Sequence, residues 1–281
     1  MHNLTNYHSH CTFCDGRADA ETFILEAIRQ GFHSYGVSSH APLPFSTHWS
    51  MEMADIDNYI CEIERLKQKY ASRIEIYTGL EIDYLTEAHN PSIPFFRNLP
   101  LDYRIGSVHL LEDSDGNLAD LDVSSEKFKI KIAERFDNDL RGVVTGYFDK
   151  LMRMLEAGGI DIVGHADKIS MNASFCEPQI TRQSWYLDKI RDYFALIAAK
   201  GVMMEINTKA FVTRNFFFPN KEHFSLIREL NIPLMVNSDS HYPEKINEGR
   251  TEALLALKEA GIDTVCELIG GKWEQRSILI S

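Results

Sequence analysis

Short β-rich runs alternate with longer helical patterns along the 281 residues, and this alternation constrains the fold more than any other feature. Seven runs are predicted to be strands, over residues 4–7, 34–38, 74–77, 103–108, 160–163, 202–206 and 234–236. Amphipathic helices are predicted between and after them, over 19–30, 55–70, 124–156, 185–200, 223–230 and 246–260. The helical stretch 124–156 is expected to break near Gly142 or Gly146.

Strands that alternate with helices predict a parallel sheet. No Pro/Gly/Ser-rich linker or low-complexity tract divides the chain, so we expect a single α/β domain over residues 1–281. Closure of the sheet into a TIM-barrel-like (β/α)7 barrel is the natural arrangement, one strand short of the usual eight.

The net charge of −12 argues against a nucleic-acid-binding surface, which is normally basic. No apolar run reaches the roughly 18 residues of a membrane helix, and the first residues do not resemble a signal peptide. We therefore expect a cytoplasmic protein, with no prediction of its oligomeric state. Its cysteines are odd in number and scattered, as is typical of reduced thiols: Cys11, Cys14, Cys61, Cys176 and Cys266. Cys11 and Cys14 form a C-x-x-C pair without a second one, and packing is the preferred interpretation.

Histidines and carboxylates follow nearly every predicted strand. In a parallel barrel the carboxyl ends of the strands meet at one face, where active sites are assembled. Nine potential ligands therefore converge there: His8, His10, Asp15, His40, Glu81, His109, His165, Asp239 and His241. Residues two apart in an extended segment point the same way, so His8 and His10 can reach one ion.

A single histidine at a strand end is more often a core or loop residue than a ligand. Burying six histidines with three carboxylates would be very costly without metal, so we predict a metal centre. Nine ligands exceed what one ion takes and suit three ions. The imidazole and carboxylate set fits zinc, iron or manganese.

Several motifs resemble the PHP (polymerase and histidinol phosphatase) family, and within it the histidinol-phosphatase branch. They are His8-Ser9-His10 with Asp15-Gly16, Gly106-Ser107-Val108-His109, Gly164-His165-Ala166-Asp167 and Asp239-Ser240-His241. The segments 39–45 and 102–109, with Trp49, Met51 and Leu121-Asp122, resemble the histidinol-phosphatase branch. The resemblance covers nearly the whole chain and implies a distorted seven-stranded barrel.

The resemblance also implies how the ligands divide among three ions. One ion would be held by His8, His10, Glu81 and Asp239. A second would share Glu81 and take His109 and His165, and a third would be held by Asp15, His40 and His241. The implied reaction is hydrolysis of L-histidinol phosphate to L-histidinol and phosphate, in histidine biosynthesis. A metal-activated hydroxide, bridging the pair of ions that shares Glu81, would attack the phosphate.

Other residues are assigned roles in this reaction. In similar proteins an arginine lies a few residues after the fifth-strand histidine, and here the nearest basic residue is Lys168. Lys168 and Arg214 would assist phosphate binding; the alternative for each is a solvated surface cation, and for Arg214 the two interpretations are equally favoured. Asp239 or His241 would pass a proton to the leaving alkoxide. Asp122 would meet the substrate amine, or else serve as a turn or helix-cap residue before Ser124.

Three alternatives stay open. The chain could act on another small phosphate monoester, because specificity drifts most readily in loops. A non-catalytic module of the kind attached to DNA polymerases would be expected to lose ligands, whereas all nine are present. A metal-dependent amidase or deaminase barrel would need a metal-bridging lysine, for which no matching position is found. The favoured partner is a small-molecule phosphate monoester, with neither nucleic acid nor membrane.

Overall fold

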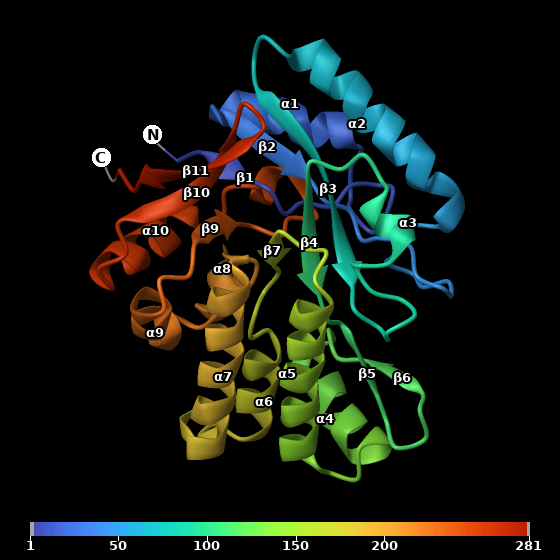
Figure 1. The fold of residues 1–281 in the computed structure, drawn as a ribbon, viewed down its shortest axis with the longest axis vertical. Helices are drawn as coiled ribbons and strands as arrows, with labels where there is room; N and C mark the ends of the chain where they lie inside the picture. Colours follow the sequence, from blue (N-terminus) through green and yellow to red (C-terminus); the bar gives the residue numbers. More distant parts are fainter. Residues whose placement is uncertain (1–2, 280–281) are drawn as a thin grey trace.

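Seven parallel strands form a nearly closed barrel in the computed structural model, which describes residues 3–279 (Figure 1). The strand order is β1-β2-β3-β4-β7-β8-β9, and every neighbouring pair is parallel. The bounds are β1 Thr5–Asn6, β2 Ser34–Val37, β3 Glu75–Asp83, β4 Tyr103–Ser107, β7 Ile162–Val163, β8 Met203–Asn207 and β9 Leu234–Asn237. Each lies within or overlaps a predicted run, so the seven-stranded α/β barrel is confirmed.

The barrel closes between β9 and β1 through side-chain and loop contacts. The backbone N–H of Tyr7 donates to Oδ1 of Asn237 over 2.9 Å, and that of His10 donates to the carbonyl of Ser240 over 2.9 Å. Ser9 and Ser240 also form an isolated parallel bridge. Because these contacts lie at the carboxyl ends of β1 and β9, they bring the segments that follow these two strands together.

The barrel interior is filled below these segments by aromatic side chains. Tyr103 crosses the interior, and its hydroxyl donates to the carbonyl of Tyr7 over 2.6 Å. An added Cβ at Gly36 would lie 2.2 Å from the Tyr103 hydroxyl oxygen, and one at Gly79 would lie 2.3 Å from the same ring. Glycine is therefore required at both positions, since the ring passes too close for any side chain.

Helices cover the outside of the barrel (Figure 1). The longer ones are α1 Ala20–Gln30, α2 Ile56–Tyr70, α4 Ser125–Arg135, α5 Leu140–Ala157, α6 Ile169–Cys176, α7 Ser184–Lys200 and α10 Arg250–Glu259. The shorter ones are α3 Pro94–Arg97, α8 Phe211–Arg214 and α9 Phe224–Glu229. Figure 1 shows α4, α5, α6 and α7 gathered at one end of the molecule. None of the helices within residues 3–279 has the length and apolar character needed to cross a membrane.

The long helical stretch breaks earlier than predicted. Helix α4 ends at Arg135, and Asp137 and Asn138 have left-handed backbones with φ of 50° and 60°. Aspartate and asparagine adopt that conformation more readily than other non-glycine residues. Asp139 then caps α5 by accepting from the N–H of Gly142 over 2.7 Å. The expected break at Gly142 or Gly146 is therefore wrong, and both glycines lie inside α5.

Two antiparallel hairpins were not predicted. Strands β5 Leu110–Glu112 and β6 Leu118–Asp120 pair directly after His109. Strands β10 Thr264–Ile269 and β11 Lys272–Ser277 pair across a Gly270-Gly271 turn. The second hairpin is tied to the barrel by Leu268, whose N–H donates to the Tyr7 hydroxyl over 2.7 Å.

Candidate metal centre

Glu81, at the carboxyl end of β3, is the centre of a buried cluster of imidazoles. Five histidine nitrogens approach its two carboxylate oxygens. The distances to Oε2 are 3.2 Å from His8 Nε2, 3.5 Å from His10 Nε2 and 2.9 Å from His40 Nδ1; those to Oε1 are 3.5 Å from His109 Nε2 and 2.8 Å from His165 Nε2. These histidines follow four different strands, β1, β2, β4 and β7, so the fold and not a local motif brings them together.

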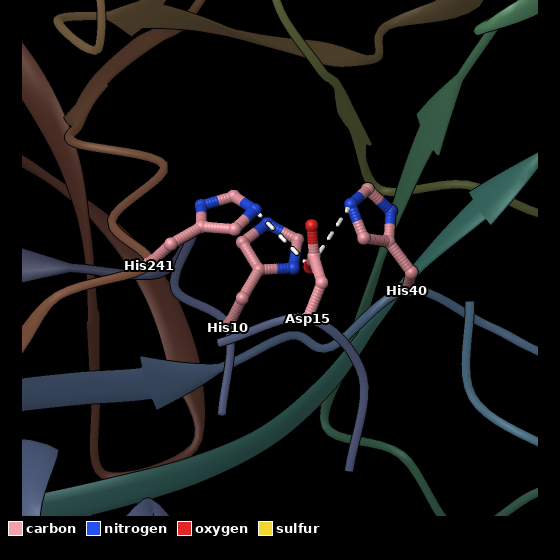
Figure 2. Close-up of side chains that lie close together, drawn as sticks. All are labelled: His10, Asp15, His40 and His241. Carbon is pink, nitrogen blue, oxygen red and sulfur yellow. Dashed lines mark ion pairs between the residues drawn. The ribbon is translucent and has the colours of Figure 1, made fainter. Parts of the chain in front are cut away.

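Asp15 and His241 complete an outer part of the cluster, together with His10 and His40. Figure 2 shows these four side chains turned toward one another. Oδ1 of Asp15 lies 3.2 Å from His241 Nε2 and 3.9 Å from His40 Nε2. The rings of His10 and His241 stack with their centroids 4.2 Å apart. All nine side chains predicted as ligands therefore lie in one continuous cluster.

The polar atoms of this cluster fit a set of bound cations. Six buried nitrogen or oxygen atoms have no hydrogen-bond partner among residues 3–279: His8 Nε2, His10 Nε2, Asp15 Oδ1, His40 Nδ1, Glu81 Oε2 and His165 Nδ1. Buried polar atoms without partners are costly and rare. Cations between them would satisfy several at once, and nitrogen and oxygen donors suit divalent metals.

Candidate ligand atoms lie within 4.8 Å of one another in four overlapping groups. The groups are His8, His10 and Asp239; Glu81, His109 and His165; His10, Asp15, His40 and His241; and His40, Asp83 and His109. The first three overlap the predicted division among ions, but the first lacks Glu81 and the third also contains His10. The fourth group contains Asp83, which was not predicted.

Charges within the cluster are strongly coupled. Burial alone would lower the pKa of His8, but Glu205, Glu81 and Asp239 raise it well above the usual value. Burial likewise opposes charge on His109, yet Asp83 and Glu81 raise its pKa to about 9. Burial would raise the pKa of Glu81, but the surrounding histidines hold it well below the usual range. The metal-free cluster therefore keeps protons on some imidazoles to balance its carboxylates.

Two carboxylates outside the predicted set orient the histidines. Glu205 accepts from His8 Nδ1, with its oxygens at 3.0 and 2.9 Å, and from the backbone N–H of His165. Asp83 does the same for His109 Nδ1, with both oxygens at 3.0 Å. Such contacts fix the ring so that Nε2 faces the metal, as outer carboxylates commonly do. The signal was present in Glu81-Ile82-Asp83, because residues two apart on a strand face the same way.

Glu205→Gln is expected to weaken metal binding about 10- to 100-fold, because it removes the carboxylate that orients His8. The measurement is competition for metal with a chromophoric chelator. Glu229→Gln, an exposed residue paired with Arg191 on the protein surface, is the matched control and should leave affinity unchanged. Equal affinity in the two variants would contradict a positioning role for Glu205.

Metal binding to the metal-free protein at pH 7.5 is expected to release protons. The pKa of His109 is raised from 6.5 to about 9, so this ring is largely charged at pH 7.5, whereas a ligand imidazole must be neutral. The raised pKa stabilises the metal-free fold below about 6.5, and this contribution is lost as the pH rises through about 9. Calorimetric titration in buffers of different ionisation enthalpy measures the release. A binding enthalpy independent of the buffer would contradict it.

Two of the cluster residues have strained backbones. His165 has φ of 24° and Asp239 has φ of 48°, in the left-handed region that non-glycine residues rarely adopt. Each such residue costs about 1–3 kcal/mol, and such strain concentrates at functional sites. A hydrogen bond at the preceding residue holds the backbone beside Asp239: the N–H of Ser238 donates to Asn6 Oδ1 over 2.7 Å.

A cavity of about 110 Å³ opens over the cluster. It is lined by Asp15, His40, His48, Trp49, His109, Asp120, Asp122, Lys209 and His241. Of the residues predicted to bind substrate, Asp122 lines this cavity. Lys168 lies behind Asp122, with Nζ 2.5 Å from Asp122 Oδ2. Arg214 is exposed at the end of α8, outside the lining.

Lys209 was missed by the sequence analysis. Its Nζ lies 3.1 Å from Asp239 Oδ1, and its side chain is 37% exposed at the cavity wall. Asn207, two residues earlier at the end of β8, donates to Glu205 and so belongs to the same cluster. A basic residue two positions beyond a strand-end asparagine was the available signal.

The C-x-x-C pair packs beside the cluster. All five cysteines are free. Cys11 is buried, with Sγ 3.3 Å from Ser39 Oγ, as expected for a packing residue. Cys14 Sγ lies 3.5 Å from Nδ1 of His10, the ring nitrogen opposite the one that faces Glu81. Cys14 therefore contacts the metal cluster from behind without facing its cavity.

Fold and site together define a metal-dependent enzyme of the parallel β/α-barrel class. A family model described as the PHP domain matches residues 6–209, and the chain belongs to this family. A Schizosaccharomyces pombe protein named "Probable histidinol-phosphatase" is 28% identical over 283 residues, covering 94% of this chain and 89% of the relative.

Solved structures of similar proteins share the fold. A candidate histidinol phosphatase from Listeria monocytogenes superposes with a TM-score of 0.74 at 25% identity, covering 88% of this chain and 99% of the other. The histidinol phosphate phosphatase of Lactococcus lactis, solved with zinc, L-histidinol and phosphate, gives a TM-score of 0.71 at 20% identity. The alignment covers 97% of this chain and 99% of that one, so the likeness extends over the whole barrel.

Proposed function

We propose that this protein is a metal-dependent phosphatase that hydrolyses L-histidinol phosphate to L-histidinol and phosphate, a step of histidine biosynthesis. The observation that carries the proposal is the convergence of five imidazoles on Glu81, with buried nitrogens that lack partners among residues 3–279. Relatives that span nearly the whole chain are named for this activity. We further propose that residues 1–281 act as one domain and work in the cytoplasm.

The centre is proposed to hold three divalent ions. His8, His10, Glu81 and Asp239 would hold the first; Glu81, His109 and His165 the second; and Asp15, His40 and His241 the third. The grouping is supported by the short distances within each set of ligand atoms. When bound, divalent ions lower the pKa of a coordinated water and neutralise charge on a phosphate ester.

The protein's own residues would organise the substrate around this centre. Glu81 is ionised, since its pKa is held well below the usual range. Its Oε2 faces His8 and its Oε1 faces His165, so the two oxygens would serve two of the proposed ions. Proton transfer to the leaving alkoxide is proposed for Asp239 or His241; His241 lines the cavity, whereas Asp239 does not. The proton-transfer roles of Asp239 and His241 are proposals, and so is a contact between Arg214 and the phosphate.

Recognition of the substrate would use the opposite wall of the cavity. Asp122 is ionised, because Lys168 and Lys209 lower its pKa despite the opposing effect of burial. Its carboxylate is proposed to bind the substrate's ammonium group, with Lys168 held behind it. Trp49 lies between His40 and His109, with ring centroids 4.8 and 5.5 Å away, and would contact the substrate imidazole.

Lys209→Met is expected to lower kcat/KM for the phosphate ester about 10- to 100-fold, with metal content unchanged. The substitution removes the ammonium group at the cavity wall, which is proposed to contact the phosphate. A charge-assisted hydrogen bond of this kind contributes about 1.5–3 kcal/mol. Steady-state kinetics with metal analysis provide the measurement. Lys221→Met, an exposed lysine at the start of the short turn before α9, is the control. Equal kcat/KM in both variants would exclude Lys209 from phosphate binding.

The experiment that tests the function is phosphate release by the purified protein from L-histidinol phosphate, with zinc, manganese or iron supplied in parallel. A panel of other small phosphate monoesters is compared under the same conditions. The proposal expects the highest kcat/KM for L-histidinol phosphate. A clearly better substrate elsewhere in the panel would move the assignment to that ester, and no release from any ester would refute the phosphatase assignment.

A further inference from the structure

A second cavity, larger than the one over the cluster, lies away from the metal cluster. Its volume is about 580 Å³, against about 110 Å³ for the cavity over the cluster. Small-molecule sites typically occupy about 300–1,000 Å³. It is lined by residues 84–87 after β3, by β5 and the residue Ser114 after it, and by residues between 135 and 153 in α4, α5 and their connection. None of the nine proposed metal ligands lines it.

One face of α5 forms the wall of this cavity. Gly142, Gly146, Lys150 and Arg153 all line it, and their spacing of four, four and three residues places them on one side of the helix. Glycine inside a helix lowers helix stability. At Gly146 an added Cβ would lie 3.6 Å from Leu111, an ordinary contact, so no close approach requires glycine there. The effect of this glycine is to leave the cavity open.

Lys150 is buried in this wall without a partner. Its side chain is 3% exposed, and Nζ has no hydrogen-bond partner among residues 3–279. Burial lowers its pKa, against the opposing effect of Glu112 and Asp83. A buried ammonium group that lacks a counter-ion is costly, so its presence at a cavity wall indicates that a ligand supplies the missing contact.

The other charged groups of the lining set the charge of that ligand. Glu87 accepts from the Tyr84 hydroxyl over 2.8 Å, and Asp139 caps α5. Arg135 is engaged by Asp113, with Nε 2.7 Å from Oδ2. Within residues 3–279 this leaves two cations of the lining, Lys150 and Arg153, and four carboxylates without an ion pair: Glu87, Glu112, Asp137 and Asp139. Such a mixed lining disfavours a polyanion.

We propose that this cavity binds the carboxylate of a small monoanionic or zwitterionic organic molecule, with Lys150 as the buried counter-ion. Arg153 lies one helical turn further along the same face; it is exposed and also lines the cavity. Leu85, Leu111 and Val143 supply an apolar wall for the body of the molecule. The site is separate from the proposed phosphatase centre and does not depend on which ester is hydrolysed there.

The test is isothermal titration of the metal-loaded protein with benzoate, a monoanion, and with L-phenylalanine, a zwitterion of similar body. Saturating inorganic phosphate is present throughout, so that the metal cluster is already occupied, and benzamide is the neutral control. We expect one equivalent of at least one carboxylate to bind with a Kd in the range of about 1 mM or tighter. Benzamide should bind at least tenfold more weakly.

Two variants separate the ligand contact from the fold. Lys150→Met keeps the aliphatic volume and should weaken binding at least tenfold. Gly146→Met fills the cavity from α5 and should abolish binding, while Gly146→Ala, which adds only a Cβ, should retain it. All three should keep the activity of the metal centre. No saturable binding of either carboxylate, or binding that survives in both Lys150→Met and Gly146→Met, would overturn the proposal.

Discussion

Glu81→Gln is expected to lower kcat/KM for phosphate ester hydrolysis by about 10³-fold or more, together with a loss of bound metal. The carboxylate of Glu81 lies within 3.5 Å of nitrogens from five histidines, so its charge balances more of the cluster than any other single group. Removing one preorganised electrostatic contact at an active site commonly costs about 10²–10³-fold, and this change also removes a ligand shared by two proposed ions.

Glu62→Gln provides the matched control for that variant. Glu62 lies on α2 and pairs with Arg65 at the surface, where such ion pairs contribute about 0–1 kcal/mol. Kinetics and metal analysis are measured on both proteins, with circular dichroism to establish that both are folded. Wild-type turnover by folded Glu81→Gln protein would remove Glu81 from the catalytic centre.

Chelation of the metals is expected to lower the melting temperature by at least about 8 °C and to abolish hydrolysis. A single ion present at about 1,000 times its Kd stabilises the folded state by about 4 kcal/mol. For chains of roughly this size, 1 kcal/mol corresponds to about 2–4 °C. The metal-free protein must also bury unpaired nitrogens of His8, His10 and His40. Calorimetric melting before and after dialysis against chelator gives the shift.

Restoring the metal supplies the control for that experiment. Readdition of divalent metal should recover both the melting temperature and the activity. The Glu81→Gln protein should respond much less to chelator than the wild type does. An identical melting temperature with and without metal would mean that the nine side chains do not hold structural or catalytic ions.

The alternation of strands and helices was sufficient to predict the barrel, because the spacing of apolar residues along the sequence differs between strands and helices. The position of the helix break was not predictable in the same way. Gly142 and Gly146 are helix breakers by propensity, yet α5 is held in place by Val144, Phe148 and Leu151 in the core. Tertiary packing overrides propensity here, and the break falls at Asp137 and Asn138.

The cluster of proposed metal ligands could be predicted because each residue lies near the end of a strand or after it, and the carboxyl ends of the strands share one face. Glu205 and Asp83 were not assigned roles, since their function depends on which ring nitrogen they meet, as in the 2.9 Å contact of Glu205 with His8. Lys209 was overlooked, although it lies two residues beyond the strand-end Asn207, because a single lysine in a loop forms no recognised motif. The cavity around Lys150 has no motif at all, and it depends on how α5 packs against β5.

Anomalous X-ray scattering from crystals of the metal-loaded protein tests the central claim most directly, since it locates ions without assuming a substrate. The account predicts three peaks: one between His8, His10 and Asp239, one between His109 and His165, and one between Asp15, His40 and His241, with Glu81 reaching the first two. Absence of any peak within ligand distance of Glu81 would contradict it.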